Sequence, residues 1–180
     1  ELNLFDGGRI NPGFLAGLVD DEDIDVNIFG GDVGPGFQAR EGSVVDIFDG
    51  WIGDYKQMIA QGRGGRIINM SSQTGSVALA KRAAYCASKA GLNLVTKVLA
   101  MEWAAHEILV NAVAPTFIET ELTREFLADP EFRQYALAKN LLKRFGTPDD
   151  VAGAVLYLAS PAANMVTGHV LLVDAGWTAH

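Results

Sequence analysis

The chain has 180 residues, 49% of them hydrophobic and 20% charged, which predicts a single globular domain over residues 1–180 with a core of its own. A formal net charge of −8 argues against nucleic acid or an anionic membrane surface as a partner, because phosphate binding requires clustered lysine and arginine. The lone cysteine, Cys86, excludes an internal disulfide and a cysteine-based zinc site, and it is typical of a reduced, cytoplasmic setting.

The amino-terminal part of the chain carries few clear structural signals. Fourteen of the 20 glycines precede residue 66, and the acidic run DDED stands at 20–23. IDVNIF at 24–29 is a candidate strand. The terminus, ELNLFDGGRI, lacks the basic flank and apolar block of a signal peptide, and no apolar run reaches the roughly 18 residues that span a bilayer. We therefore expect a soluble protein.

Beyond residue 65 each segment has the period of a definite element. The runs RIINM at 66–70 and ILVNAVAP at 108–115 each predict a strand buried on both faces. Residues 84–104 have a helical period with two apolar stripes, which predicts a helix covered on most sides. One stripe consists of Leu92, Val95, Leu99 and Trp103, and the other of Ala87, Gly91, Leu94, Val98 and Met101.

Two further elements complete the pattern. A helix is predicted to start with Thr147 as N-cap and Pro148 at its first position, and the positive helix end explains the paired carboxylates of Asp149 and Asp150. HVLLVDAG at 169–176 predicts a last strand. Strands that alternate with helices predict an α/β fold with a parallel sheet joined by crossovers.

Polar residues follow two of these strands. Ligands of parallel sheets bind at the carboxyl ends of the strands, where Ser72 and the segment PTFIET at 115–120 stand. Tyr85 and Lys89, four residues apart on the predicted helix, share one face with Cβ atoms about 5–6 Å apart. A free phenol is a poor base near neutrality, but a neighbouring ammonium favours its ionised form. The pair is a candidate proton-transfer group, although polar pairs at this spacing are common on helix surfaces.

From about residue 65 to the carboxyl terminus the chain resembles the short-chain dehydrogenase/reductase family. Five segments match that family in order and spacing: GRIINMSS, AAYCASKAGL, VNAVAPTFIETEL, RFGTPDDVAGAVLYLAS and TGHVLLVDAG. The resemblance implies a Rossmann-like, doubly wound parallel sheet with its catalytic half at 63–180. It also implies an enzyme that interconverts a secondary alcohol and a ketone with NAD or NADP.

The resemblance implies a role for each matching residue. Ser72 would hydrogen-bond the reacting oxygen, Tyr85 would exchange its proton and also contact the cofactor, and Lys89 would hold the nicotinamide ribose and favour the ionised tyrosine. The nicotinamide end of the cofactor would contact Pro115, the Ile118 main chain and the Thr120 hydroxyl. Thr120 is equally suited to cap the helix that follows. The family usually has glycine where this chain has Thr116, so the local turn is expected to differ.

The amino-terminal half, residues 1–62, departs from the family pattern. The first strand and its TGxxxGxG turn do not follow LNLFDGGRI. GGDVGPG at 30–36 has that glycine spacing, but its distance from Ser72 better suits a later strand with an NNAG turn. Residues 41–65 resemble the next family helix with a block missing after Gly53, and the asparagine of the catalytic tetrad has no counterpart.

Two explanations fit this departure. Either the cofactor cradle has been deleted, or the sequence is part of a longer enzyme. We expect the second, because random drift that erased the cradle would also have altered the serine, tyrosine and lysine. A mass of about 19 kDa for the intact protein would contradict it.

The only evidence on the substrate is the likeness of two segments to particular members of the family. PTFIETEL and SSQTGSVAL look most like members that act on sugars, polyols or sugar acids, with 3-oxoacyl carrier-protein reductases as the alternative. A non-catalytic member that serves only in assembly is a further alternative. The segment 122–135 is expected to form a lid over the pocket or to pack in the core, through Phe126, Phe132 and Tyr135.

Other expectations concern partners and metals. Family members commonly form tetramers through the tyrosine-bearing helix and the last strand, so a homo-oligomer, a tetramer or dimer, is expected. Small residues at Ala83, Ala87, Ala90 and Gly91 permit close helix approach there, and packing in the core of one chain explains them equally well. Cys86 is interpreted as a small buried hydrophobic residue. No metal site and no Ser/His hydrolase is expected, since His106, His169 and His180 share no motif with a serine or an acid.

Overall fold

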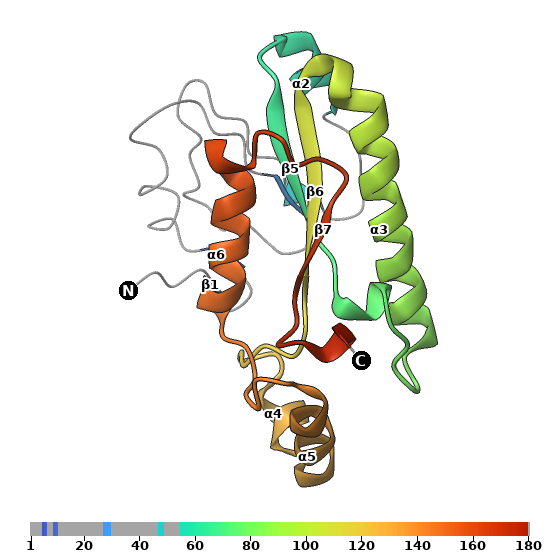
Figure 1. The fold of residues 1–180 in the computed structure, drawn as a ribbon, viewed down its shortest axis with the longest axis vertical. Helices are drawn as coiled ribbons and strands as arrows, with labels where there is room; N and C mark the ends of the chain where they lie inside the picture. Colours follow the sequence, from blue (N-terminus) through green and yellow to red (C-terminus); the bar gives the residue numbers. More distant parts are fainter. Residues whose placement is uncertain (1–4, 7–8, 11–26, 30–46, 49–54, 180) are drawn as a thin grey trace.

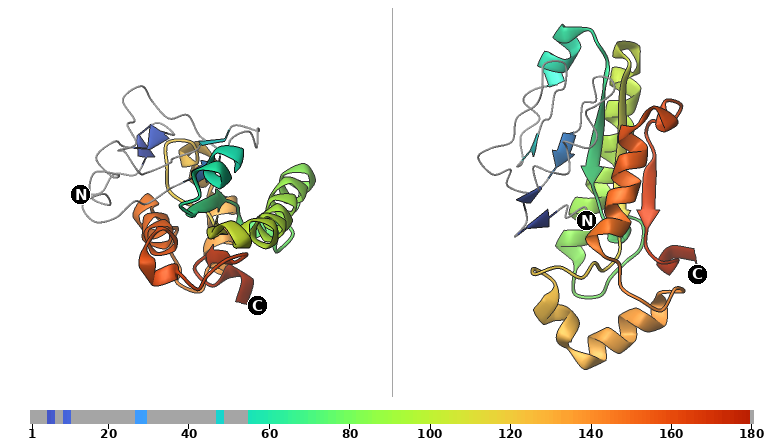
Figure 2. Two further views of the ribbon diagram at one scale, coloured as in Figure 1. Left: turned by 90° about the horizontal axis from the view of Figure 1, so that it is seen from above. Right: turned by 90° about the vertical axis from the view of Figure 1, so that its left-hand side faces the viewer.

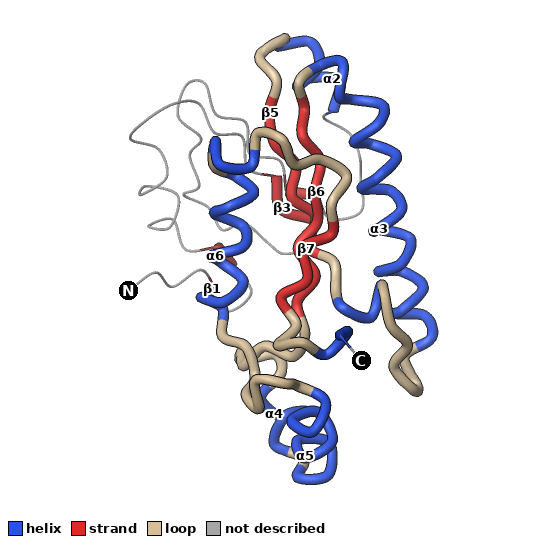
Figure 3. Tube along the Cα trace, viewed as in Figure 1, coloured by secondary structure: helices blue, strands red, loops and turns tan. Residues whose placement is uncertain are grey.

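The computed structural model describes residues 5–6, 9–10, 27–29, 47–48 and 55–179 of the chain. Its main feature is a parallel five-stranded sheet in the order β4-β3-β5-β6-β7 (Figures 1 and 3). The strands are β3 Asn27–Phe29, β4 Ile47–Phe48, β5 Gly65–Met70, β6 Ile108–Pro115 and β7 Val170–Val173. The short strands β1 Phe5–Asp6 and β2 Arg9–Ile10 pair antiparallel as a separate sheet.

Helices cover both faces of the sheet and its carboxyl edge. The α-helices are α2 Tyr55–Gln61, α3 Ala83–Trp103, α4 Arg124–Ala128, α5 Pro130–Lys139 and α6 Pro148–Ala159. Short 3-10 turns are η1 Gln73–Gly75, η2 Ala104–His106, η3 Pro161–Ala163 and η4 Trp177–Ala179. Figure 2 shows α3 and α6 on opposite sides of the strands, with α4 and α5 beyond one end. The predicted α/β fold is confirmed.

Alternating side chains of β5 and β6 enter two separate cores. Ile67 packs with Leu99 and Trp103 of α3, whereas its neighbour Ile68 packs with the α6 side, in the cluster of Leu158. Both isoleucines are buried, so the β-branched run is explained by burial on both faces. Each such side chain contributes about 1.5–3 kcal/mol relative to an exposed one.

The expectation that α3 is covered on most sides is wrong for this chain. Its first stripe is buried at Leu99 and Trp103, but the second faces outward: Leu94 is 64% exposed and Met101 is 81% exposed. Helical period indicates an apolar face without indicating what covers it. In the described part of the chain the sheet covers one side of α3 and leaves the other to solvent.

The last strand is shorter than predicted because a turn begins at Asp174. The strand β7 ends at Val173, and Ala175 and Gly176 then take positive φ values of 52° and 80°. The Asp174 carboxylate accepts hydrogen bonds from the backbone N–H groups of Gly176 at 3.0 Å and Thr178 at 2.8 Å, and from the Thr178 hydroxyl at 2.6 Å. Burial raises the pKa of Asp174, but these donors outweigh it and the pKa lies below its ordinary value.

The amino-terminal expectations are confirmed only in part. The strand in IDVNIF is observed as β3, and Ile28 pairs in parallel with Ile68, next to the strand that ends at Ser72. The helix predicted within 41–65 is observed from Tyr55 onward as α2, whereas Ile47–Phe48 form β4, since the run VVDIF favours extended backbone. The predicted NNAG-like turn at 30–36 lies outside the described residues.

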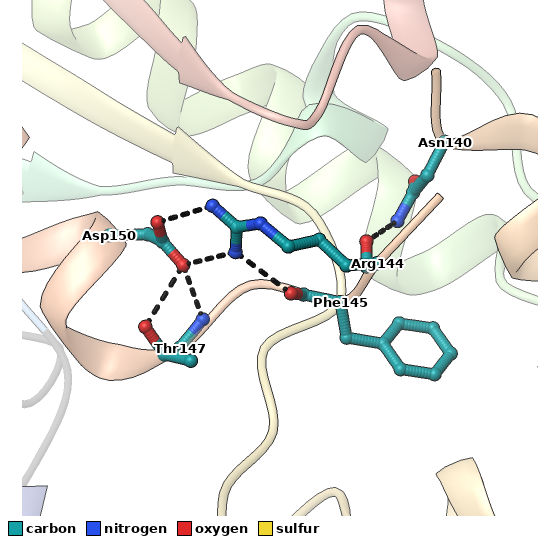
Figure 4. Close-up of polar contacts among 5 residues, drawn as sticks. All are labelled: Asn140, Arg144, Phe145, Thr147 and Asp150. Carbon is teal, nitrogen blue, oxygen red and sulfur yellow. Dashed lines mark hydrogen bonds and ion pairs between the residues drawn. The ribbon is translucent and has the colours of Figure 1, made fainter. Parts of the chain in front are cut away.

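An ion pair joins the segment after α5 to the first turn of α6 (Figure 4). Arg144 donates two parallel hydrogen bonds to Asp150, with N–O distances of 2.7 and 2.8 Å. The same carboxylate accepts from the Thr147 backbone N–H at 2.7 Å and the Thr147 hydroxyl at 2.9 Å, which confirms the predicted helix start. The hydrogen bond from Arg144 is the main reason that the pKa of Asp150 lies well below its ordinary value; burial opposes this, and Thr147 adds to it.

We predict that Asp150→Asn lowers the free energy of unfolding at neutral pH by about 1 kcal/mol, the usual loss for a helix cap. The folded-state pKa is depressed, so this stabilisation is complete above the ordinary carboxyl pKa and is lost as the pH falls below about 4. Thermal unfolding of both proteins across this pH range measures the difference. The control is Asp149→Asn, an exposed carboxylate in the same turn. Equal effects of both variants, or a pH-independent difference, would contradict the prediction.

Candidate active site

Ser72 lies directly after β5, at the carboxyl edge of the sheet. The adjacent Ser71 donates its backbone N–H to the Val113 carbonyl of β6 at 2.7 Å, so the ends of the two strands are held side by side. Ser72 is the N-cap of η1 and is 7% exposed. Its hydroxyl oxygen accepts hydrogen bonds from the Thr74 backbone N–H at 3.3 Å and the Thr74 hydroxyl at 3.0 Å.

Tyr85 and Lys89 reach the same edge from the first turns of α3. The Lys89 ammonium donates to the Met70 carbonyl at 2.8 Å, two residues before Ser72. It lies 5.8 Å from the centroid of the Tyr85 ring, and Tyr85 is 46% exposed. Burial lowers the pKa of Lys89 below its ordinary value. The structure therefore brings the predicted lysine to the strand end that carries the predicted serine, with the predicted tyrosine beside it.

A close contact between η1 and α3 supports this arrangement. A Cβ on Gly75 would lie 2.9 Å from the Lys89 carbonyl oxygen and 2.5 Å from Asn93 Nδ2, so only glycine fits there. The Ser71 hydroxyl also hydrogen-bonds Asn93 Oδ1. Backbone and side-chain contacts thus fix the loop that carries Ser72 onto the helix that carries Lys89.

The end of β6 and the segment after it place Pro115, Ile118 and Thr120 along the same edge. Ile118 forms a bridge with Gly146, and its carbonyl accepts a hydrogen bond from the Thr123 hydroxyl. The Thr120 hydroxyl lies 3.1 Å from the same hydroxyl. The expectation that Thr120 caps the next helix is wrong: α4 has Thr123 as its N-cap, and the Thr123 side chain binds Ile118 instead of the helix.

The backbone at Thr116 takes this turn without strain, although the Thr116 hydroxyl is buried and has no hydrogen-bond partner among the described residues. The Thr116 backbone N–H donates to the Val173 carbonyl of β7 at 3.1 Å, and Thr116 is not among the described residues with positive φ. The turn therefore does not require the glycine that other family sequences have at this point.

Helices α4 and α5 form a cap beyond the carboxyl ends of the strands (Figure 1). An aromatic cluster holds them there. Phe126 of α4 and Phe132 of α5 have ring centroids 3.9 Å apart, and Phe132 is 5.0 Å from Phe117 in the segment after β6. Tyr135 reaches Trp177 near the carboxyl terminus, at 5.8 Å. The core packing expected of this segment is therefore observed for Phe126 and Phe132, whereas its role as a lid over the pocket stays a prediction.

Several contacts at this edge were not predicted from the sequence. They involve Thr74, Gly75, Asn93 and Thr123. The signal for Thr74 was the pattern Ser-x-Thr, because a serine at a turn commonly accepts a hydrogen bond from the residue two positions later. The predicted buried position of Cys86 is only partly realised, since its side chain is half-buried and its Sγ lies 4.0 Å from the Leu79 carbonyl.

The described residues contain no group of three or more histidine, cysteine, aspartate or glutamate side chains that could hold a metal ion. In the same residues, each helix is too short or too polar to cross a bilayer.

Comparison with known proteins shows a family match over most of the chain. The family model described as enoyl-(acyl carrier protein) reductase matches residues 53–178. An NAD-dependent glycerol dehydrogenase of Listeria innocua is 47% identical over 125 residues, which cover 68% of this chain and 48% of that protein. A 2-dehydro-3-deoxy-D-gluconate 5-dehydrogenase of Escherichia coli is 40% identical, with 69% and 49% covered.

Solved structures resemble the same part of the chain. The crystal structure of a putative 2-deoxy-D-gluconate 3-dehydrogenase from Agrobacterium tumefaciens with bound NADP has a TM-score of 0.68 and 40% sequence identity. The match covers 69% of this chain and 51% of that one. The chain thus spans about half the length of the relatives that it matches.

We predict that Gly75→Ala lowers the free energy of unfolding by about 1–3 kcal/mol, the usual penalty for overpacking, because the Lys89 backbone cannot retreat within a helix. Chemical denaturation measures the loss. The matched control is Gly153→Ala in α6, where an added Cβ meets no atom within 4 Å and the helix gains about 0.5–1 kcal/mol. Stabilisation by both substitutions would show that η1 does not pack tightly on α3.

Proposed function

The chain belongs to the short-chain dehydrogenase/reductase family, and from this premise we propose that it is an NAD(P)-dependent oxidoreductase that interconverts a secondary alcohol and a ketone. The observation that carries the proposal is the position of Lys89. Its ammonium is bound to the Met70 carbonyl at the end of β5, 5.8 Å from the Tyr85 ring centroid. A cation at this place favours negative charge on the tyrosine, which is what a proton acceptor needs.

The residues present fit the nicotinamide end of the cofactor. Lys89 offers a half-buried ammonium for ribose hydroxyls, and Pro115, Ile118 and Thr120 offer main-chain groups and a hydroxyl for the carboxamide. Thr120 currently contacts another hydroxyl at 3.1 Å, a neutral partner that it can exchange for an amide. When bound, the nicotinamide accepts a hydride from the alcohol carbon or returns it to the ketone.

In the direction of oxidation, the Tyr85 phenolate oxygen takes the proton of the substrate hydroxyl. The carbon–hydrogen bond breaks with its electron pair, which leaves as the hydride, and a carbon–oxygen double bond forms. Lys89 stabilises the phenolate before this transfer. Ser72 donates a hydrogen bond to the substrate oxygen as it gains negative charge, in both directions of the reaction.

The substrate class that we propose is a polyol, sugar or sugar acid. The relatives described above are named for glycerol and for deoxygluconate derivatives, which are small polyhydroxylated compounds. The second candidate is a 3-oxoacyl thioester; the description of the family model also names an acyl carrier protein, but with an enoyl group and not a 3-oxoacyl group on it.

We predict that Tyr85→Phe lowers kcat at least a hundredfold, because the substrate proton loses its acceptor. A panel of glycerol, galactitol and gluconate with each oxidised cofactor, and an acetoacetyl thioester with each reduced one, identifies the substrate for this measurement. The dissociation constant of NADH or NADPH, from nicotinamide fluorescence, should stay unchanged.

The matched control is Tyr157→Phe on α6, a partly exposed tyrosine outside the site. Near-wild-type turnover of Tyr85→Phe with intact cofactor binding would refute the mechanism. A well-folded wild type that binds neither cofactor at millimolar concentration would favour the non-catalytic alternative.

The exposed stripe of α3 leads us to propose a homo-oligomer, a dimer or tetramer. Leu94, Val98 and Met101 form an exposed apolar row, and small residues beside them at Ala87 and Gly91 permit close approach of a second copy. Burial of such a row is the usual reason for a helix to be apolar on its outer side.

We predict that Leu94→Glu shifts the protein toward monomer, because a charge would be buried against a second copy. Light scattering over a dilution series measures the mass. Leu122→Glu changes a leucine away from α3 that is still more exposed, at 93% against 64% for Leu94, and it should leave the mass unchanged. A wild type that is monomeric at every concentration would contradict the prediction.

A further inference from the structure

We propose that Thr74 is a positioning residue that holds the Ser72 hydroxyl as a hydrogen-bond donor for the substrate oxygen. This inference rests on the proposed function and adds a residue to the same site. Its basis is the pair of hydrogen bonds from Thr74 to Ser72 Oγ, one from the backbone N–H at 3.3 Å and one from the hydroxyl at 3.0 Å.

A hydroxyl group has one proton to donate and two lone pairs that accept. Thr74 supplies a donor to each of the two lone pairs of Ser72. Within the described part of the chain, Ser72 Oγ takes part in hydrogen bonds only as an acceptor. Its own proton is therefore left to point away from Thr74, toward whatever acceptor enters the site.

Burial makes this orientation effective. Ser72 is 7% exposed and Thr74 is 6% exposed, so water competes little with their bonds. A hydroxyl that accepts hydrogen bonds becomes a stronger donor, by about 10–30% for each bond. Thr74 thus both directs the Ser72 proton and strengthens its bond to an oxygen that becomes negative in the transition state.

The two bonds from Thr74 are not equivalent. The bond from the backbone N–H occurs wherever a serine begins a turn, and it needs no particular side chain at position 74. The bond from the hydroxyl is shorter and depends on a serine or threonine there. Substitution at Thr74 can therefore remove the second bond and keep the first.

The test compares Thr74→Val, which keeps the shape and removes the hydroxyl, with Thr74→Ser, which keeps the hydroxyl. We expect valine to lower kcat about three- to tenfold with unchanged dissociation constants for NADH and NADPH, and serine to restore at least half of the loss. In a Ser72→Ala background, Thr74→Val should have no further effect, because Thr74 acts through Ser72.

The inference would be overturned if Thr74→Val left kcat unchanged, or if it lowered kcat equally in the wild-type and Ser72→Ala backgrounds. Turnover by the wild type would still support the proposed function in that case. A wild type without turnover would refute the proposed function instead. In that case thermal unfolding of the wild type, Thr74→Val, Ser72→Ala and the variant with both substitutions still tests the bond. Coupled losses of Tm at the two positions would support it, and strictly additive losses would overturn it.

Discussion

The contact between the end of β5 and the first half of α3 determines whether the site exists. Ser72 belongs to the sheet layer, whereas Tyr85 and Lys89 belong to a helix layer, so contacts between the two layers set the distance between these residues. The Lys89–Met70 hydrogen bond, with the glycine-dependent approach of η1, joins the two layers at this point. The Lys89 ammonium therefore has two roles: it donates a hydrogen bond that joins the sheet to α3, and it supplies the positive charge beside Tyr85.

The remaining contacts divide between stability and access. The ion pair of Arg144 with Asp150 fixes the start of α6, on the face of the sheet opposite α3. The cap of α4 and α5 is held by aromatic rings that reach back to Phe117 and Trp177, so the segments after β6 and β7 support it together. Each layer therefore has its own attachment to the carboxyl edge, and the edge is where all of them meet.

Local patterns predicted the elements well and their surroundings poorly. The strand β6 is observed with its predicted bounds, and α6 begins at Pro148 as predicted. Both signals are local, because a run of apolar residues marks a buried strand and capping residues mark a helix start within a few positions. The second apolar stripe of α3 was wrongly predicted to be covered, because helical periodicity identifies an apolar face but not what packs against it. Thr120 was misjudged as a cap because the side-chain contacts of Thr123 with Ile118 depend on a bend that adjacent residues do not encode.

The buried Ser72 and the partly exposed Tyr85 differ in how far water can hydrogen-bond to their hydroxyl groups. The tyrosine can exchange hydrogen bonds with water, but Ser72 is nearly enclosed and its oxygen already accepts twice from Thr74. A hydrogen bond is electrostatically stronger where water is excluded. A substrate oxygen that accepts the Ser72 proton would therefore gain more from this buried serine than from an exposed one.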